Sequence, residues 1–162
     1  MLKLLFLDVD GTLTGGSVYI SNEGELFKEF NVKDGLGISQ RLSSKGIVPV
    51  VVTGRYSAST QIRCEELGID MVYQGIKDKK NLIVSICREK KVLFNEVAYI
   101  GDDINDLASM QLIKAKGGII GCPFDAIEDV KSICNFVSSK SGGKGAVRDF
   151  IEYLIRNMNE SL

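Results

Sequence analysis

The chain has 162 residues, of which 44% are hydrophobic and 25% are charged, a balance typical of a folded globular protein. Lys and Arg total 20 against 21 for Asp and Glu, so the net charge offers no basic field for nucleic acid or an anionic membrane. No apolar run reaches the roughly 18 residues of a membrane-spanning helix, and the absence of His excludes histidine-based acid or base catalysis.

Short apolar runs that end in polar, glycine-containing turns are the main signal along the chain. These runs are Leu4 to Leu7, Ile47 to Val52 and Val97 to Ile100. They are typical of buried parallel strands. Helical patterns lie between them, at 35–45, 57–67 and 79–89. Strands that alternate with helices predict an α/β fold with a doubly wound, mostly parallel, Rossmann-like sheet, in one domain that spans residues 1–162.

The remaining elements have weaker signals. We expect further strands at 71–73, 118–120 and 135–137, and helices at 125–131 and 146–157. Residues 17–30 depart from the alternation, because two apolar segments flank the turn-rich residues 21–24. This pattern predicts a β-hairpin inserted after the first strand.

Acidic and polar side chains follow three of the predicted strands. Asp8 and Asp10 come after the first strand, Thr53 after the second, and Asp102 and Asp103 after the third. The carboxyl ends of parallel strands meet at one edge of a sheet, so these side chains should converge. Carboxylates so close together repel one another unless a cation lies between them, and a hard, oxygen-preferring ion suits them. The sequence therefore predicts a Mg²⁺ site.

Each of these segments also has an ordinary structural explanation when taken alone. A pair of aspartates two residues apart is common in loops, Thr53-Gly54 is a plausible turn, and Asp78-Lys79 is a typical capped helix start. Residues 101–106 are more specific, because four acidic or amide side chains directly after a buried strand are costly without a cation. Their order and placement together favour a functional site.

With four motifs in the right order, the sequence resembles the haloacid dehalogenase superfamily. The matching segments are 8–12, Thr53, Lys79 and 101–106. The resemblance implies a phosphatase in which Asp8 attacks phosphorus, while Asp10 protonates the leaving oxygen and later activates water. It implies also that Thr53 and Lys79 neutralise the charge of the transferring phosphoryl group.

The resemblance also assigns the metal and its surroundings. Mg²⁺ would be bound by Asp8, Asp102 and the backbone carbonyl of Asp10. Asp103 and Asp106 would support the site from its edge.

Larger members of the superfamily carry a cap domain after the first motif or between the second and third motifs. Residues 14–33 and 54–79, which fill these two positions here, are too short for one. The chain therefore looks like the small capless, tetrameric branch of the superfamily. The matching stretches are 8–12, 33–38, 52–55, 73–75 with 78–79, 99–106 and 141–148. This branch acts on phosphorylated 2-keto-3-deoxy sugar acids and serves lipopolysaccharide precursor synthesis. In this branch the hairpins of four subunits associate into a barrel. Such a barrel would cover the apolar surface of the hairpin at 17–30, so the resemblance predicts a homotetramer.

Specificity is expected from residues around the phosphate site. The predicted substrate-binding residues are Thr53, Gly54, Arg55, Lys79, Asn105, Lys144 and Arg148. Arg suits bidentate recognition of a carboxylate, and the glycines beside Lys144 resemble an anion cradle. In this branch Arg55 favours an eight-carbon acid 8-phosphate, whereas relatives acting on nine-carbon sialic-type acid 9-phosphates carry Glu there. The nine-carbon ester is the alternative substrate.

Two readings from other classes remain open. A receiver-like signalling domain also uses Asp, Thr, Lys and Mg²⁺, but it would carry its acceptor Asp after the third strand. A weakly active scaffold is the other, although Asp8, Asp10, Thr53, Lys79 and Asp102 are all intact. The four cysteines form no CxxC pair and no secretory segment precedes the first motif, which together predict a cytoplasmic protein.

Overall fold

A parallel sheet of six strands forms the centre of the molecule in the computed structural model, which describes residues 1–160. The strands lie in the order β5-β4-β1-β6-β7-β8, and every neighbouring pair is parallel. Their bounds are β1 Leu4–Leu7, β4 Val48–Val52, β5 Met71–Tyr73, β6 Val97–Ile100, β7 Ile119–Cys122 and β8 Phe136–Val137. The predicted α/β fold is confirmed.

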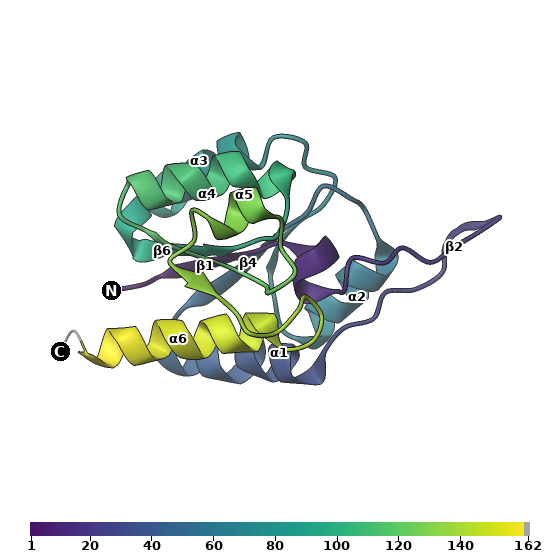
Figure 1. The fold of residues 1–162 in the computed structure, drawn as a ribbon, viewed down its shortest axis with the longest axis horizontal. Coiled ribbons are helices and arrows are strands. Elements are labelled where there is room, and N and C mark those ends of the chain that lie inside the picture. The colour runs from purple at the N-terminus through teal and green to yellow at the C-terminus, as the bar shows by residue number, and fades with distance from the viewer. Residues whose placement is uncertain (161–162) are drawn as a thin grey trace.

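Helices cover both faces of this sheet (Figure 1). One face carries α3 Lys79–Lys90, α4 Ile104–Ala115 and α5 Glu128–Lys131, and the other carries α1 Val32–Leu36, α2 Ala58–Glu66 and α6 Ala146–Glu160. Each face has its own buried cluster: Ile83 and Met110 belong to one, and Cys64 and Leu154 to the other. Alternate residues of β1 point to opposite clusters, because side chains alternate along a strand.

The predicted helix at 35–45 is longer and less regular than expected. It begins with α1, whose N-cap Asn31 accepts hydrogen bonds from the amides of Lys33 and Asp34. It continues through wider turns in η2 Gly37–Leu42 and tighter ones in η3 Ser43–Lys45. A short turn, η4 Phe94–Glu96, also precedes β6. The capping side chain moves the start of the helix ahead of its apolar pattern.

Helix α4 is the main element that sequence patterns did not predict. Its start carries the acidic residues after β6, for which the sequence predicts a metal site but no helix. Asp103 nevertheless forms a capping box with Asp106, a local signal that predicts a helix start. No helix within residues 1–160 is long and apolar enough to span a membrane.

The predicted hairpin is present, but its two strands are shorter than the apolar segments that predicted them. Its antiparallel strands are β2 Ile20–Ser21 and β3 Gly24–Glu25, and they project from the body as an arm of residues 17–30 (Figure 1). The arm follows η1 Val9–Leu13, the turn that leads away from β1. Val18, Tyr19, Ile20, Leu26 and Phe27 are exposed on it.

Candidate active site

The catalytic edge of the sheet brings together the side chains that follow β1, β4 and β6. These three strands are neighbours, so Asp8, Thr53 and Asp102 meet beyond their carboxyl ends. A cavity of about 310 Å³ opens there. It is lined by Asp8, Asp10, Gly11, Gly16, Thr53, Gly54, Arg55, Asp102, Asp103, Ile104 and Asn105. Most of the predicted site residues thus share one cavity.

Lys79 makes the most direct contact with the predicted nucleophile. It is the first residue of α3 and is buried. Its Nζ lies 2.6 Å from Oδ1 of Asp8 and 2.6 Å from Oδ1 of Asp106. Although burial opposes its charge, the two carboxylates raise the pKa of Lys79 above its ordinary value. The ammonium therefore remains charged beside Asp8.

Asp106 anchors this lysine rather than facing the cavity. Its Oδ1 also accepts a hydrogen bond of 2.6 Å from the hydroxyl of Tyr99, and its Oδ2 accepts from the amides of Asp102 and Asp103. Gly101 permits this approach, because a Cβ at that position would lie 2.5 Å from the Asp106 carboxylate. Sequence reasoning missed Tyr99, which looked like an ordinary residue of a buried strand.

The carboxylates are arranged to hold a divalent cation. Ligand oxygens of Asp8, Asp102 and Asp106 lie within 4.8 Å of one another. Burial, together with neighbouring carboxylates, raises the pKa of Asp8 to about 6 and that of Asp102 to about 9. At neutral pH Asp8, beside the Lys79 ammonium, is already mostly ionised, whereas Asp102 would be ionised only with a further cation beside it. Asp106 is already engaged by four donors and does not line the cavity, so Asp8 and Asp102, which do, are the side chains that could hold Mg²⁺.

Gly11 lets the loop after β1 pass close to Asp102. Its φ is +92°, and a Cβ would lie 2.0 Å from Oδ2 of Asp102. The hydroxyl of Thr12 donates a hydrogen bond of 3.2 Å to Oδ1 of the same carboxylate. The glycine and the threonine thus fix Asp102 against the loop that carries Asp8 and Asp10.

The arm supplies two contacts that sequence reasoning did not find. Nζ of Lys28 lies 2.5 Å from Oδ1 of Asp10 and 3.3 Å from Oε2 of Glu25. Glu25 in turn pairs with Arg55 at 3.4 Å. The spacing of Glu25 and Lys28 resembles an ordinary surface pair, so only the folded arm reveals that they reach the site.

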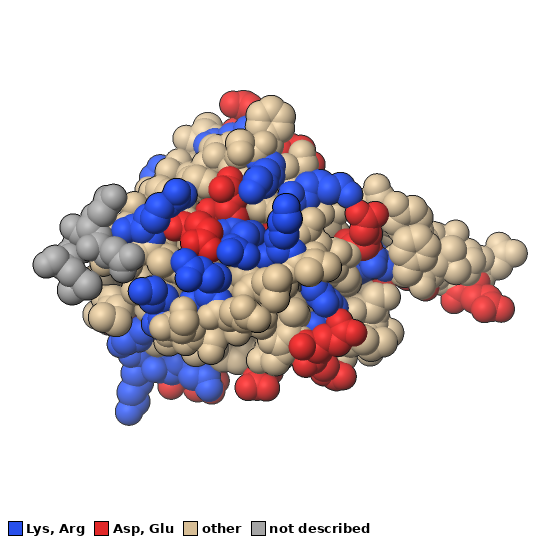
Figure 2. Space-filling model, turned by 90° about the horizontal axis from the view of Figure 1, so that it is seen from below, with Lys and Arg blue, Asp and Glu red and all other residues tan. Residues whose placement is uncertain are grey.

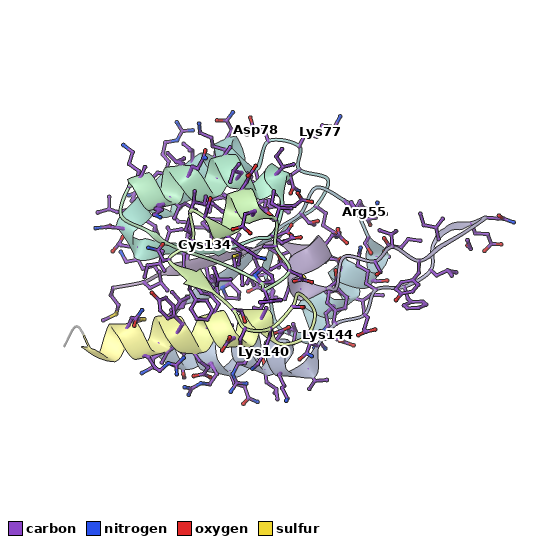
Figure 3. All side chains as sticks on the ribbon, viewed as in Figure 1. Arg55, Lys77, Asp78, Cys134, Lys140 and Lys144 are labelled. Carbon is purple, nitrogen blue, oxygen red and sulfur yellow. The ribbon has the colours of Figure 1, made fainter. Side chains whose placement is uncertain are left out.

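The predicted substrate-binding residues are not all in one place. Arg55 and Asn105 line the catalytic cavity, whereas Lys144 lines a neighbouring cavity of about 330 Å³ and pairs with Glu29 at 2.5 Å. Arg55 lies near the base of the arm and Lys144 near the start of α6 (Figure 3).

Arg148 does not line the catalytic cavity. Its guanidinium pairs with Glu152 at 2.8 Å, and its amide donates to Asp34. Arg148 lies in the first turn of α6, and its guanidinium also donates to the carbonyl of Lys33 in α1. The structure therefore does not bring Arg148 together with the other predicted site residues.

Fold and site together place the chain in the class of haloacid dehalogenase-type hydrolases. In Escherichia coli K12, 3-deoxy-D-manno-octulosonate 8-phosphate phosphatase KdsC is 36% identical over 154 residues, which cover 95% of this chain and 79% of that protein. A protein of the same name from Yersinia pestis is 34% identical, with coverage of 95% and 80%. The chain belongs to the family of 3-deoxy-D-manno-octulosonate (KDO) 8-phosphate phosphatases. No family model matches it.

Solved structures agree with this assignment. The Moraxella catarrhalis phosphatase, crystallised with a magnesium ion, a phosphate ion and KDO, has a TM-score of 0.88 and 35% identity. The match covers 96% of this chain and 86% of that one. The cobalt-bound enzyme from Haemophilus influenzae has a TM-score of 0.88 and 34% identity, with coverage of 96% and 88%. The haloacid dehalogenase resemblance is confirmed.

Proposed function

We propose that this chain is a Mg²⁺-dependent phosphatase that hydrolyses KDO 8-phosphate to KDO and phosphate. The observation that carries the proposal is the buried contact of 2.6 Å between Asp8 and Lys79, at a cavity that Thr53 and Asp102 also line. The likeness to KdsC of Escherichia coli supports the choice of ester. A receiver-like domain or an inactive scaffold has no comparable support.

The proposed reaction has two displacements at phosphorus. In the first, a carboxylate oxygen of Asp8 forms a bond to phosphorus while the bond from phosphorus to the sugar oxygen breaks. The departing oxygen takes a proton from Asp10. In the second, Asp10 takes a proton from water, which attacks the aspartyl phosphate and restores Asp8.

Charge neutralisation supports both displacements. The hydroxyl of Thr53, nearby backbone amides and the Lys79 ammonium would stabilise the equatorial phosphoryl oxygens. Mg²⁺, held by Asp8, Asp102 and the carbonyl of Asp10, would add further positive charge there. Asp106 and Asp103 support these groups from α4 through their capping contacts.

For the sugar acid we propose contacts along the rim of the cavity. Arg55 and Asn105, with Gly54, line the same cavity as Asp8 and Thr53. Lys144 would act from the neighbouring cavity, where it now pairs with Glu29. For Arg148 to take part, its guanidinium would have to leave Glu152.

A homotetramer built through the arm is part of the proposal. The rings of Tyr19 and Phe27 stack 4.4 Å apart on the projecting arm, where Figure 2 shows few charged side chains except near the tip. An isolated hairpin with such exposed apolar surface is marginal in water unless it is covered. Light scattering at micromolar protein should give the mass of four chains, and a monomeric mass would contradict this assembly.

We also propose that the enzyme works in the cytoplasm on lipopolysaccharide precursors. Cys64, Cys87, Cys122 and Cys134 are all free thiols in the part of the chain that the structure describes. Free, mostly buried thiols suit a reducing compartment.

A substrate panel tests the proposed function. KDO 8-phosphate, a nine-carbon 2-keto acid 9-phosphate and p-nitrophenyl phosphate should be assayed with Mg²⁺ and with excess chelator. We expect the highest kcat/KM for KDO 8-phosphate and loss of turnover in chelator. Preference for the nine-carbon ester would overturn the choice of substrate, and turnover that is unaffected by chelator would overturn the Mg²⁺ dependence.

A further inference from the structure

Lys28 is a buried lysine at the catalytic edge that none of the motifs explains. Only 3% of its side chain is exposed, although the arm that carries it projects from the body. Its Nζ lies 2.5 Å from Oδ1 of Asp10. A buried ammonium is costly unless it is paired, so this contact is part of how the arm joins the site.

Glu25 holds Lys28 in place from the other side. Its Oε2 lies 3.3 Å from Nζ of Lys28, and its Oε1 accepts a hydrogen bond from the hydroxyl of Ser57. Arg55 adds a contact of 3.4 Å to the same carboxylate. Ser57 directly precedes α2, so Glu25 ties the arm to the loop that follows β4. Lys28 is therefore held at two points.

Asp10 has one oxygen engaged and the other available. The Lys28 contact uses Oδ1, whereas Oδ2 has no hydrogen-bond partner among residues 1–160. Asp10 lines the catalytic cavity, and its side chain is 21% exposed. It lies in the turn after β1, where no regular helix or strand constrains the side chain. The ammonium therefore holds a carboxylate that no regular secondary structure positions.

We propose that Lys28 is a positioning residue for Asp10, holding its Oδ1 so that Oδ2 faces the scissile ester oxygen. The inference rests on the proposed phosphatase function. When the bond from phosphorus to the sugar oxygen breaks, that oxygen takes the electron pair and the proton of Asp10, while Lys28 keeps its own protons. The arm then contributes to the chemistry of its own subunit in addition to assembly.

Leaving-group dependence separates positioning from a merely structural role. An alkoxide needs a proton to depart, whereas p-nitrophenolate departs with little help, so a misplaced Asp10 should affect the two esters unequally. The rate of phosphoryl transfer to Asp8 should be measured by quenched flow in one turnover, with KDO 8-phosphate and with p-nitrophenyl phosphate. The variants are Lys28→Met and Lys28→Arg, with the exposed Lys90→Met as matched control.

For Lys28→Met we expect a loss of about 100-fold with KDO 8-phosphate and less than about 5-fold with p-nitrophenyl phosphate. Lys28→Arg should recover most of the rate, and Lys90→Met should match the wild type. Mg²⁺ affinity by titration calorimetry should change less than about twofold, because Lys28 contacts the carboxylate of Asp10 and not its carbonyl, Asp8 or Asp102. Equal losses with both esters, or no loss, would overturn the inference.

Two further outcomes are a Lys28→Met variant that does not fold and a wild type that is inactive. If Lys28→Met does not fold, Glu25→Gln carries the test at saturating ester, where weaker binding through Arg55 does not enter the rate, because it loosens Lys28 without removing it. The same unequal loss supports positioning, and equal losses refute it. If the wild type hydrolyses neither ester, the proposed function fails together with this inference. If the wild type is active and the variants match it, only the inference fails.

Discussion

Two lysines meet two aspartates at the catalytic edge, and they come from different kinds of structure. Lys79 begins a long helix packed on the sheet, and its contact with Asp8 is almost completely buried. Lys28 comes from an arm whose strands have only two residues each, and its partner Asp10 is partly exposed. The first pair is fixed by the core, whereas the second depends on a few ion pairs. We therefore expect changes at the first pair to affect stability and activity, and changes on the arm to affect mainly activity and assembly.

The largest effect is expected at the nucleophile. Asp8→Asn should lower kcat by at least about 10⁴-fold, because an amide is a poor nucleophile for phosphorus. The variant keeps the shape of the side chain, and Lys79 keeps its pair with Asp106, so the loss of unfolding free energy should be smaller than that of Lys79→Met. Steady-state assays with KDO 8-phosphate check the first expectation. Substantial turnover by a pure variant would contradict the covalent mechanism.

Loss of Lys79 should lower both the stability and the activity of the protein. Lys79→Met removes the ammonium from Asp8 and Asp106, and leaving buried carboxylates unpaired costs about 3–5 kcal/mol of unfolding free energy. We expect kcat to fall by about 10²- to 10³-fold as well. Urea unfolding and steady-state kinetics measure the two losses. A variant that lost activity alone would break the distinction between core and arm.

Gly11 offers a sharper test of the metal ligand. A methyl group from Gly11→Ala would displace Asp102, whose Oδ2 lies 2.0 Å from that position, so Mg²⁺ affinity should fall about 10- to 100-fold. Gly24→Ala is the matched control: its φ is also positive, at +115°, but nothing lies within 4 Å of the added carbon. Titration calorimetry compares them. Equal losses of affinity would assign the effect to backbone strain instead.

An ion network outside the catalytic cavity should contribute to stability and not to activity. Arg41 and Arg148 both bind Glu152, and the hydrogen bond from Arg41 is the main reason that the pKa of Glu152 falls to about 2. A lowered folded pKa stabilises the protein above the ordinary value of 4.5, and this contribution is lost as the pH falls toward 2. Glu152→Gln should cost about 1 kcal/mol at neutral pH, and the difference should shrink in acid. Urea unfolding at several pH values checks this, with kcat unchanged.

The smallest effect on protomer stability is expected on the arm. Phe27 is half exposed and stacks on Tyr19, so Phe27→Ser should change the unfolding free energy of the protomer by less than about 0.5 kcal/mol. It should nevertheless weaken the tetramer, because it removes apolar surface that assembly would bury. Light scattering over a range of concentrations measures this. An unchanged mass together with a large loss of protomer stability would show that the arm packs on its own domain.

The sequence alone determined the sheet, most helices and the acidic edge. Apolar runs such as Val97 to Ile100 are local signals, and parallel strands must end at one edge, so Asp8, Thr53 and Asp102 could be placed together without coordinates. Helix α4 was missed although its signal is local: its capping box coincides with the acidic motif.

Only the tertiary structure decided which side chains meet across long separations. Tyr99 reaches Asp106 from inside a strand, Lys28 reaches Asp10 from the arm, and Arg148 turns away toward Glu152. Such contacts depend on the direction of each side chain and on the path of a short, irregular segment. Neither periodicity nor residue spacing encodes these features, because they are set by the packing of elements that are distant in the chain.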